Sequence, residues 1–393
     1  MIPFPTDSGS KIRIYEFTKR LSNAHSVSLI GLHPQPYLDK NTIDKLGFMK
    51  TIVPVAHSTS KLKAIAKWVF SQLPYRYVKM KNSNFRKAVE LELKTNSYDV
   101  VILHCLDSVQ NLPSEKNKKV TYVLDQHNDD IIWYKSFSNS KSFVKRVFSY
   151  ENIRRQRIRN QKDYKQIDLC LCVSLADLYN TRKQVNNSSV LFEHIPNGAD
   201  FSNFQRTNYT YKKNLIFCGS LDVEMNIDAI TFFIRDIFPL VIKELPETIL
   251  TVVGRNPSKK VRDACQHRNI HLYSNVESVV PFYNDAQVIV LPFRHGGGSK
   301  LKVMEAIAME VDIVSTEAGV VGIPPEVVDY LSISNDTLAF ASKTIEKLKI
   351  DFSNPIERHR LASLKSRCVN EYSWAAQHRR IEVLLNQICT SKN

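Results

Sequence analysis

Residues 288–306 read VIVLPFRHGGGSKLKVMEA, and this stretch decides the fold class. Its first six residues are almost all apolar and rich in β-branched side chains, which is typical of a strand buried on both faces. Three glycines and Ser299 follow, and residues 301–306 are mostly good helix formers. The stretch therefore predicts a strand, a glycine turn and a helix in series, which is the repeating unit of a parallel α/β sheet.

The same alternation runs along the whole chain. The interval from Ile230 to Ile237 has helical spacing, and we expect that helix to end near Pro239. Eleven strands are many for one doubly wound sheet, so we predict two such domains joined by the polar segment 198–212. The predicted strands are 25–32, 51–55, 100–104, 121–126, 169–174, 215–220, 249–254, 271–274, 288–293, 312–316 and 331–334.

The composition excludes several protein classes. The chain has 393 residues, of which 43% are hydrophobic and 24% charged, so it is neither disordered nor fibrous. No apolar run approaches the ~18 residues of a transmembrane helix, and residues 1–7 lack the basic and apolar regions of a secretory signal. The seven cysteines include no Cys-x-x-Cys pair, and we expect Cys170 and Cys172 to be inert. We therefore expect a soluble cytoplasmic protein without a metal site.

The positive charge is concentrated in the first half of the chain. The net charge is +15, and residues 1–200 hold 31 basic and 18 acidic residues, against 23 and 21 in the remainder. Residues 45–89 contain ten Lys or Arg and no acid. Such a surface attracts anionic membranes or nucleic acid. No helix-turn-helix, zinc-finger or RNA-binding signature is present, so we expect no nucleic-acid partner.

Residues 61–70 have the pattern of a basic amphipathic helix. Leu62, Ile65, Trp68 and Val69 fall on one side of the predicted helix, and three lysines border them. This arrangement is typical of a helix that lies on an anionic membrane surface. The alternative is a helix packed on the core with its lysines in solvent.

The glycine turn is a candidate anion site, because ligands of open α/β sheets bind beyond the carboxyl ends of the strands. Glycines let backbone N–H groups approach a ligand, and a helix N-terminus favours negative charge. Lys300 or Lys302 can add a full charge, and Glu305 can accept hydrogen bonds from a ribose diol. These features indicate a nucleoside diphosphate. The alternative is an ordinary glycine-rich loop before an exposed charged helix.

Other polar residues follow predicted strands. Gly219 and Gly254 permit close approach of a ligand, Asn226 is either a ligand contact or a plain helix cap, and Arg255 either contacts phosphate or is solvated. His127 could contact a substrate hydroxyl or carry a proton near neutral pH, and the alternative is a polar turn residue. His104 ends another strand, and a glycine turn at 7–11 opens a predicted helix.

Taken in order, these segments resemble the GT-B fold glycosyltransferases, in the large retaining family 4, also called glycosyl transferases group 1. The resemblance covers nearly the whole chain, and the run 372–374 looks like the start of a tail that returns to the N-terminal domain. The matching segments are 5–10 (PTDSGS), 125–128 (DQHN), 172–177 (CVSLAD), 195–200 (IPNGAD), 217–220 (FCGS), 253–257 (VGRNP), 281–283 (PFY) and 296–306 (GGGSKLKVMEA).

The resemblance implies two Rossmann-like domains that face a cleft. Residues 1–198 would bind the acceptor, residues 199–370 would bind a nucleotide sugar, and residues 371–393 would form the returning helix. The reaction would retain anomeric configuration without a metal or other cofactor. The residues implied are His127 and Glu305 as catalytic; Gly219, Asn226, Arg255, Val276, Gly297, Gly298, Ser299, Lys302 and Glu305 for the donor; and Gly9, Ser10 and His104 for the acceptor.

The function predicted from the sequence is sugar transfer to a glycan or lipid-linked acceptor, in cell-surface polysaccharide or glycolipid synthesis at the inner face of the plasma membrane. The alternatives are a nucleotide-sugar epimerase and a non-catalytic scaffold of the same fold. Three positions depart from the family pattern. Gly297 stands where a Glu is common, Asn226 stands where a basic residue is usual, and only residues 1–4 are available for the first strand.

Overall fold

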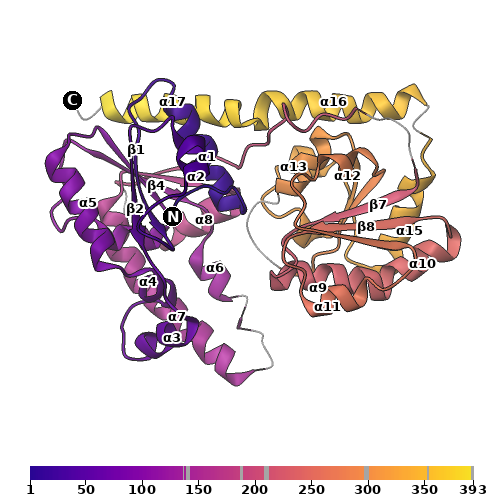
Figure 1. The fold of residues 1–393 in the computed structure, drawn as a ribbon, viewed down its shortest axis with the longest axis horizontal. Coiled ribbons are helices and arrows are strands. Elements are labelled where there is room, and N and C mark those ends of the chain that lie inside the picture. The colour runs from indigo at the N-terminus through magenta and orange to yellow at the C-terminus, as the bar shows by residue number, and fades with distance from the viewer. Residues whose placement is uncertain are drawn as a thin grey trace. The chain divides into compact units, whose positions relative to one another are not determined.

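The computed structural model describes residues 1–135, 137–138, 142–185, 189–207, 212–295, 301–351 and 354–390. The chain divides into two compact units. The first contains Met1–Asn197 and Gln377–Asn393, and the second contains Gly198–Ala376. Each unit is built from parallel strands and helices (Figure 1). None of the described helices is long and apolar enough to cross a membrane.

The strands of the first unit form two parallel sheets, β1-β2 and β3-β4-β5-β6. The strands are β1 (Ser28–His33), β2 (Thr51–Ala56), β3 (Val100–His104), β4 (Thr121–Gln126), β5 (Leu169–Cys172) and β6 (Leu191–His194). The helices are α1 (Gly9–Leu21), α2 (Lys40–Leu46), α3 (Lys61–Val69), α4 (Tyr75–Met80), α5 (Ser83–Thr95), η1 (Leu106–Asn111), α6 (Asp130–Lys135), α7 (Phe143–Asp163), η2 (Tyr164–Gln166) and α8 (Leu175–Gln184).

The N-terminal segment lies against β1 without forming a strand. The backbone N–H of Ile2 donates to the carbonyl of Leu32 at 3.1 Å. A Cβ on Gly31 would lie 2.6 Å from Ile2 Cδ1, so a larger residue there would displace this segment. Cys170 and Cys172 are fully buried free thiols on β5 that pack in the core of the four-stranded sheet, in agreement with their predicted structural role.

The second unit contains one six-stranded parallel sheet with the order β12-β11-β10-β7-β8-β9. The strands are β7 (Asn214–Cys218), β8 (Ile249–Gly254), β9 (Ile270–Ser274), β10 (Val288–Leu291), β11 (Asp312–Ser315) and β12 (Ser332–Ile333). The helices are α9 (Glu224–Phe232), η3 (Phe233–Ile237), α10 (Phe238–Glu244), α11 (Lys259–Ala264), α12 (Val280–Asn284), α13 (Leu301–Ala308), η4 (Glu317–Gly319), α14 (Pro325–Val328), α15 (Thr337–Lys349) and α16 (Pro355–Tyr372).

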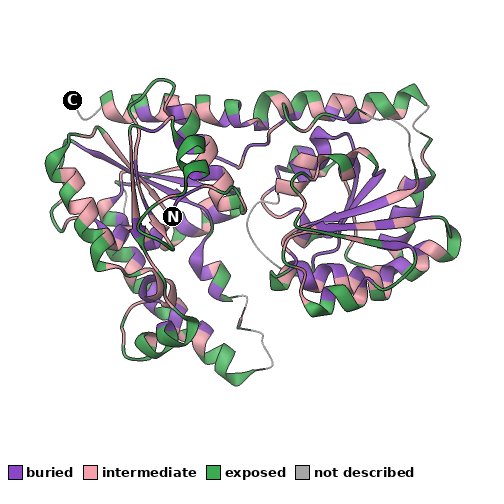
Figure 2. Ribbon diagram, viewed as in Figure 1, coloured by how far each residue is buried: buried purple, intermediate pink, exposed green. Residues whose placement is uncertain are grey.

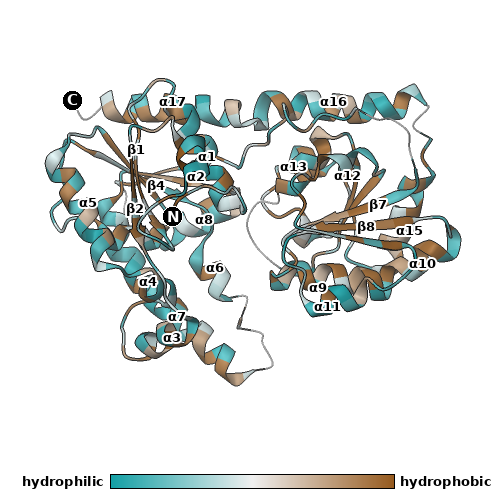
Figure 3. Cartoon of the chain, in the orientation of Figure 1, coloured by the Kyte–Doolittle hydropathy of each residue, from teal (hydrophilic) through white to brown (hydrophobic). Residues whose placement is uncertain are grey.

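Helices cover both faces of this sheet, with α9, α10 and α11 on one face and α12 and α13 on the other (Figure 1). The four inner strands β7, β8, β10 and β11 are therefore mostly buried (Figure 2) and hydrophobic (Figure 3), whereas the edge strands β9 and β12 are partly exposed. The strand order reverses between the neighbours β7 and β10. The carboxyl ends of those two strands are the topological switch point, where α/β sheets bind ligands.

The last helix, α17 (Trp374–Thr390), begins in the second unit and continues in the first. At its start, Ala199 pairs with Ser373 in an isolated parallel bridge. A Cβ on Gly198 would lie 2.6 Å from the backbone nitrogen of Trp374, so glycine allows this crossing. Farther along, Arg380 donates to the carbonyl of His194 at 2.7 Å within the first unit.

Two elements differ from the sequence prediction. The strand β6 was not predicted, because its residues Leu-Phe-Glu-His mix apolar and charged side chains. The predicted helix end near Pro239 is wrong. Residues 233–237 form a π-helical turn, and the helix resumes as α10 with Pro239 in its first turn. Proline has no N–H and clashes with the preceding turn, and the widened π turn accommodates both effects.

Candidate functional site

The turns that follow β7 and β8 in the second unit are hydrogen-bonded to one another. The N–H of Gly219 donates to the carbonyl of Val253 at 3.0 Å, and the N–H of Leu221 donates to the carbonyl of Arg255 at 2.8 Å. A Cβ on Gly254 would lie only 1.8 Å from the carbonyl oxygen of Gly219. Glycine at position 254 therefore lets these turns meet, as its place after a predicted strand suggested.

Lys302 lies beside the Gly219 turn. Its Nζ is 3.4 Å from Asn226 Oδ1 and lies over the rings of Phe217 and Phe293, 5.3 and 4.8 Å from their centroids. A Cβ on Gly219 would be 3.1 Å from both that Nζ and the Asn226 amide. The structure therefore brings together three residues predicted to bind the donor.

Burial lowers the pKa of Lys302 to about 8, and the nearby acidic groups Cys218 and Glu305 only partly oppose this shift. None of the ion pairs found among the described residues includes Lys302, and its polar neighbour Asn226 is neutral. A cation held in this way gains favourable interactions when an anion enters the site.

Glu305 lies one turn after Lys302 on α13, so the two side chains share a face of that helix. The hydroxyl of Tyr283, on α12, donates to Glu305 Oε2 at 3.3 Å. Burial raises the pKa of Glu305, while Lys302 and the Tyr283 hydroxyl lower it in part. Glu305 is thus a partly solvent-shielded acceptor close to a cation, which suits a ligand that offers both hydroxyl groups and negative charge.

Two further predicted donor residues lie at the same edge of the sheet. Arg255, after β8, donates to Ser220 Oγ at 3.0 Å, so it supports the turn after β7. Val276 follows β9 and packs against the core, next to Asn275, which has a positive φ of 57°. The predicted residues Gly297, Gly298 and Ser299 lie outside the described residues. Before them, Arg294 forms an ion pair with Asp228.

A second polar cluster occupies the carboxyl edge of the four-stranded sheet in the first unit. Asp125 is fully buried on β4, and Arg13 of α1 donates to it through Nε at 2.8 and 3.0 Å. Oδ2 of the same carboxylate is 3.0 Å from His104 Nδ1 and 3.0 Å from His127 Nε2. His104 pairs with Asp125 in the β3–β4 register, and strand periodicity places residues 125 and 127 on one face.

The two predicted histidines are therefore brought together, but around a carboxylate that the sequence analysis did not single out. Arg13 was also missed, although Phe17, four residues later, lies on the same face of the helix and was a signal that this face would be buried. Burial opposes ionisation of Asp125, but Arg13 and His127 outweigh it and hold the pKa of the carboxyl well below its usual range. Burial lowers the pKa of His127 more than Asp125 raises it.

The ligand atoms of His104, Asp125 and His127 lie within 4.8 Å of one another, which is close enough to hold a metal ion. Arg13 already neutralises the carboxylate, however, and a buried guanidinium disfavours a second cation. We therefore interpret the cluster as a hydrogen-bond network. The predicted acceptor residues Gly9 and Ser10 begin α1, the helix that carries Arg13.

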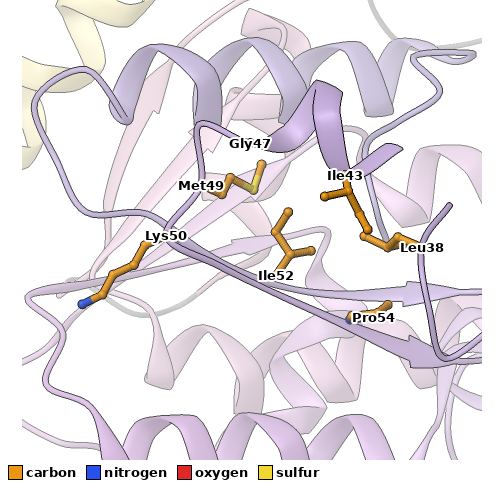
Figure 4. A pocket seen from close by; sticks show the side chains of 7 residues that line it. All are labelled: Leu38, Ile43, Gly47, Met49, Lys50, Ile52 and Pro54. Carbon is orange, nitrogen blue, oxygen red and sulfur yellow. The ribbon is translucent and has the colours of Figure 1, made fainter. Parts of the chain in front are cut away.

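A separate pocket of about 350 Å³ lies beside β2 in the first unit (Figure 4). Its walls include Leu38, Ile43, Met49 and Ile52, and the one charged residue that lines it is Lys50. The lining offers no second polar side chain that could act together with Lys50 on a substrate, so we assign the pocket no function.

Comparison with known proteins supports the predicted fold. Residues 212–349 match the family model described as Glycosyl transferases group 1. The chain is similar to WaaG, a glycosyltransferase involved in lipopolysaccharide biosynthesis, with 12% identity, a TM-score of 0.62, and coverage of 97% of this chain and 96% of WaaG. A TarM variant of S. aureus, in complex with fondaparinux, α-GlcNAc-glycerol and UDP, has 14% identity and a TM-score of 0.55. That match covers 76% of this chain and 58% of TarM.

The chain thus has the GT-B fold, as predicted, and its residues 212–349 match the model of group 1 glycosyl transferases. The chain is also 23% identical, over 361 residues, to an uncharacterized 44.6 kDa protein in the cps region of Klebsiella pneumoniae. That match covers 88% of this chain and 89% of the relative.

Proposed function

We propose that the protein is a retaining glycosyltransferase that moves a sugar from a nucleotide-diphosphate sugar to a glycan or lipid-linked acceptor, without a metal. The observation that carries this proposal is the Lys302 site in the second unit. The desolvated ammonium of Lys302 lies beside the neutral amide of Asn226 and the glycine turn at Gly219. This turn is at the switch point of the parallel sheet, and Lys302 is one helical turn from Glu305. The family match over residues 212–349 includes this site.

Each group has a distinct task in this proposal. Lys302 binds the diphosphate and stabilises the negative charge that grows on it as the glycosidic bond breaks. Glu305 accepts hydrogen bonds from the ribose hydroxyls, and Tyr283 holds its carboxylate in place. Asn226 orients Lys302, and its own amide is fixed by donation to the carbonyl of Ser220 at 2.8 Å. His127 of the first unit contacts the transferred sugar.

A thermal-shift panel with UDP, GDP, ADP, CDP and dTDP tests the nucleotide site. A ligand at about 100 times its dissociation constant adds about 2.7 kcal/mol to stability. We expect one diphosphate to stabilise the protein and Glu305→Ala to lose that effect. Glu346→Ala, an exposed acid on α15, is the matched control and should respond like the unmodified chain. If no diphosphate binds, the non-catalytic scaffold is favoured instead.

A nucleotide sugar of the base found in that panel then distinguishes the remaining alternative. A transferase releases nucleoside diphosphate in an acceptor-dependent manner and forms a new glycoside of the same anomeric configuration. An epimerase converts the sugar without any acceptor. Measurement of both products by NMR decides between them, and an inverted product would contradict the retaining mechanism.

We further propose that the protein binds its acceptor at an anionic membrane surface, in cell-surface polysaccharide or glycolipid synthesis. On α3 only Ala64 is buried, whereas Leu62 is 81% exposed and Phe70, which follows the helix, is 92% exposed. Trp68 points the other way and packs on Phe148 of α7, at 5.0 Å between ring centroids. The apolar face of α3 is therefore outward, unlike that of a core-packed helix.

The beginning of α7 extends this apolar surface. Its exposed side chains include Phe143, Val144 and Tyr150, and basic residues lie among them. Arg155 joins the two helices, since its Nη1 donates to the Trp68 carbonyl at 2.9 Å. Both helices are largely exposed along this side (Figure 2). Exposed aromatic and aliphatic side chains beside lysines match the chemistry of an anionic lipid interface.

Co-sedimentation with liposomes tests this surface. We expect binding to phosphatidylglycerol-containing vesicles, weaker binding at high salt, and little binding to pure phosphatidylcholine. Leu62→Ser/Phe70→Ser removes two exposed apolar side chains that would enter the lipid, and it should lower partitioning at least about tenfold. The control is Leu338→Ser/Ile356→Ser, which removes two apolar residues of the second unit that are 68% and 74% exposed. Equal binding to both lipids, or equal loss in both variants, would contradict the proposal.

A further inference from the structure

Two asparagines lie beside each other at the carboxyl edge of the sheet in the second unit. Asn256 follows β8 and Asn275 follows β9, and both have a positive φ, of 50° and 57°. Asparagine is one of the few residues that adopt this left-handed conformation. The backbone N–H of Asn275 donates to the carbonyl of Gly254 at 3.0 Å, so the two turns are held together.

The side-chain amide of Asn275 has a fixed orientation. The backbone N–H of Asn256 donates to Asn275 Oδ1 at 3.1 Å. Because a backbone N–H can only donate, the oxygen of the Asn275 amide must face Asn256, and its Nδ2 must face away. Asn275 is exposed, and its Nδ2 has no hydrogen-bond partner among the described residues. The protein therefore presents an oriented pair of N–H donors to solvent at this edge of the sheet.

A series of contacts connects this amide with the proposed ribose site. The hydroxyl of Tyr283, on α12, donates to Glu305 at 3.3 Å. The neighbouring residue, Phe282, packs against Tyr273 of β9, with 4.7 Å between the ring centroids. Tyr273 is 42% exposed, and Asn275 comes two residues after it. The turn after β9 and the acid that would bind the ribose are therefore parts of one packed region.

The strand order gives the direction in which a nucleotide would extend. Lys302 lies beside the turn after β7, at the switch point, and β8 and β9 follow outward from there. A nucleoside diphosphate has its diphosphate at one end, its ribose in the middle and its base at the other end. With the phosphates at Lys302 and the ribose at Glu305, the base extends toward the turns that follow β8 and β9.

We propose that Asn275 selects the base of the nucleotide sugar, because its Nδ2 donates a hydrogen bond to an exocyclic carbonyl oxygen of that base. The inference rests on the proposed function and narrows the donor class. Uracil, thymine and guanine carry a carbonyl oxygen on the ring edge away from the ribose, whereas cytosine and adenine carry an amino group there. An amino group would place two donors against each other and leave both without an acceptor. Asn256 is a positioning residue, since its backbone N–H holds the amide in this orientation.

Isothermal titration of the full chain with UDP, dTDP, GDP, CDP and ADP tests the base preference. We expect UDP, dTDP or GDP to bind most tightly, at least about tenfold more tightly than the amino base of the same ring size, which is CDP for the pyrimidines and ADP for GDP. If CDP or ADP binds most tightly, the proposal is wrong.

Asn275→Asp replaces the donor with an acceptor and keeps the shape of the side chain. One carboxylate oxygen can still accept from the Asn256 N–H, and aspartate also tolerates a positive φ. The added negative charge weakens binding of every diphosphate, so the ratio of affinities is the readout. We expect the preference for the carbonyl base over the amino base to fall at least about tenfold.

The matched control is Asn117→Asp in the first unit. Asn117 is also exposed, and its Oδ1 accepts from the backbone N–H of Lys119 at 3.0 Å. This variant should keep the base preference of the unmodified chain. An equal change in both variants, or an unchanged ratio in Asn275→Asp, would contradict the selection of the base by Asn275.

Asn275→Gly is the second variant, because glycine adopts a positive φ readily and carries no amide. The base preference should again fall, whereas inorganic pyrophosphate, which has no base, should bind as tightly as to the unmodified chain. Weaker pyrophosphate binding would show that Asn275 only supports the fold of the site. If no diphosphate binds at all, the proposed function fails and this inference fails with it. If a diphosphate binds in a manner that depends on Glu305 but both Asn275 variants keep the base preference, this inference fails alone.

Discussion

Replacing Lys302 with methionine should make the unliganded protein more stable and its nucleotide binding weaker. The Lys302 ammonium is desolvated between two phenylalanine rings and a neutral amide, so its charge is costly until an anion arrives. Methionine is similar in length, packs well against aromatic rings and brings no charge. A variant that is more stable but binds the nucleotide more weakly identifies Lys302 as a ligand-binding residue. A lysine that stabilises the fold would instead lose stability when replaced.

The structure gives the size of both effects. A pKa lowered from 10.5 to about 8 corresponds to about 3 kcal/mol at 1.36 kcal/mol per unit. Lys302 keeps some solvent contact, so we expect Lys302→Met to gain about 1–2 kcal/mol at pH 7. Because the folded pKa is the lower one, the cost of the charge is complete below pH 8 and disappears as the pH rises toward 10.5. A lost charged hydrogen bond of about 1.5–3 kcal/mol weakens nucleotide binding about 10- to 100-fold.

Urea denaturation and isothermal titration with the nucleoside diphosphate measure the two quantities on the same samples. Lys349→Met is the control, since Lys349 is an exposed lysine on α15 paired only with an exposed glutamate. That variant should change neither stability nor affinity. The reasoning is refuted if Lys302→Met loses stability and still binds the diphosphate as tightly as the unmodified chain.

Two further substitutions test the packing inside each unit. Gly254→Ala places a Cβ against the Gly219 carbonyl and should lower the free energy of unfolding, measured by urea denaturation, by about 1–3 kcal/mol. Gly47→Ala is the control, because its nearest neighbour is 3.5 Å away, and it should be neutral or slightly stabilising. Equal effects of the two substitutions would contradict the close approach at Gly254. Burial raises the pKa of Asp107 from 3.8 to about 6, so the folded state favours the neutral acid. The cost of its burial grows as the pH rises from about 3.8 and is complete above about 6. Asp107→Asn should therefore stabilise the protein by about 1–3 kcal/mol near pH 7.5 and by much less near pH 4.5, and a gain that does not depend on pH would argue against this cause.

Much of the fold could be predicted from the sequence because its strands are short, continuous and apolar. Runs such as Thr121–Gln126 and Ile249–Gly254 are strands over the predicted residues. Leu191–His194 was missed because one edge strand needs only a partly apolar sequence. The continuation of the helix past Pro239 was missed because a proline predicts a helix break. No local sequence pattern indicates that a π turn before the proline accommodates it.

The candidate site was predictable where it depends on strand ends and not where it depends on packing between distant segments. Gly219 follows one predicted strand, and Lys302 lies on the helix after a second predicted strand of the same sheet. Their proximity therefore follows from the topology. Arg13 and Asp125 are 112 positions apart, and nothing in either local sequence indicates the other. The outward face of α3 was also undetermined until Trp68 was seen to pack on Phe148.

The central claim is that the second unit binds the diphosphate of a nucleotide, and titration of the unmodified chain with a nucleoside and its diphosphate tests it most directly. The base is the one chosen by the thermal-shift panel. Two phosphates beside Lys302 should strengthen binding by at least about tenfold over the nucleoside alone. Lys302→Met should remove most of that difference while leaving nucleoside binding unchanged. Equal affinity for the nucleoside and its diphosphate would contradict the account.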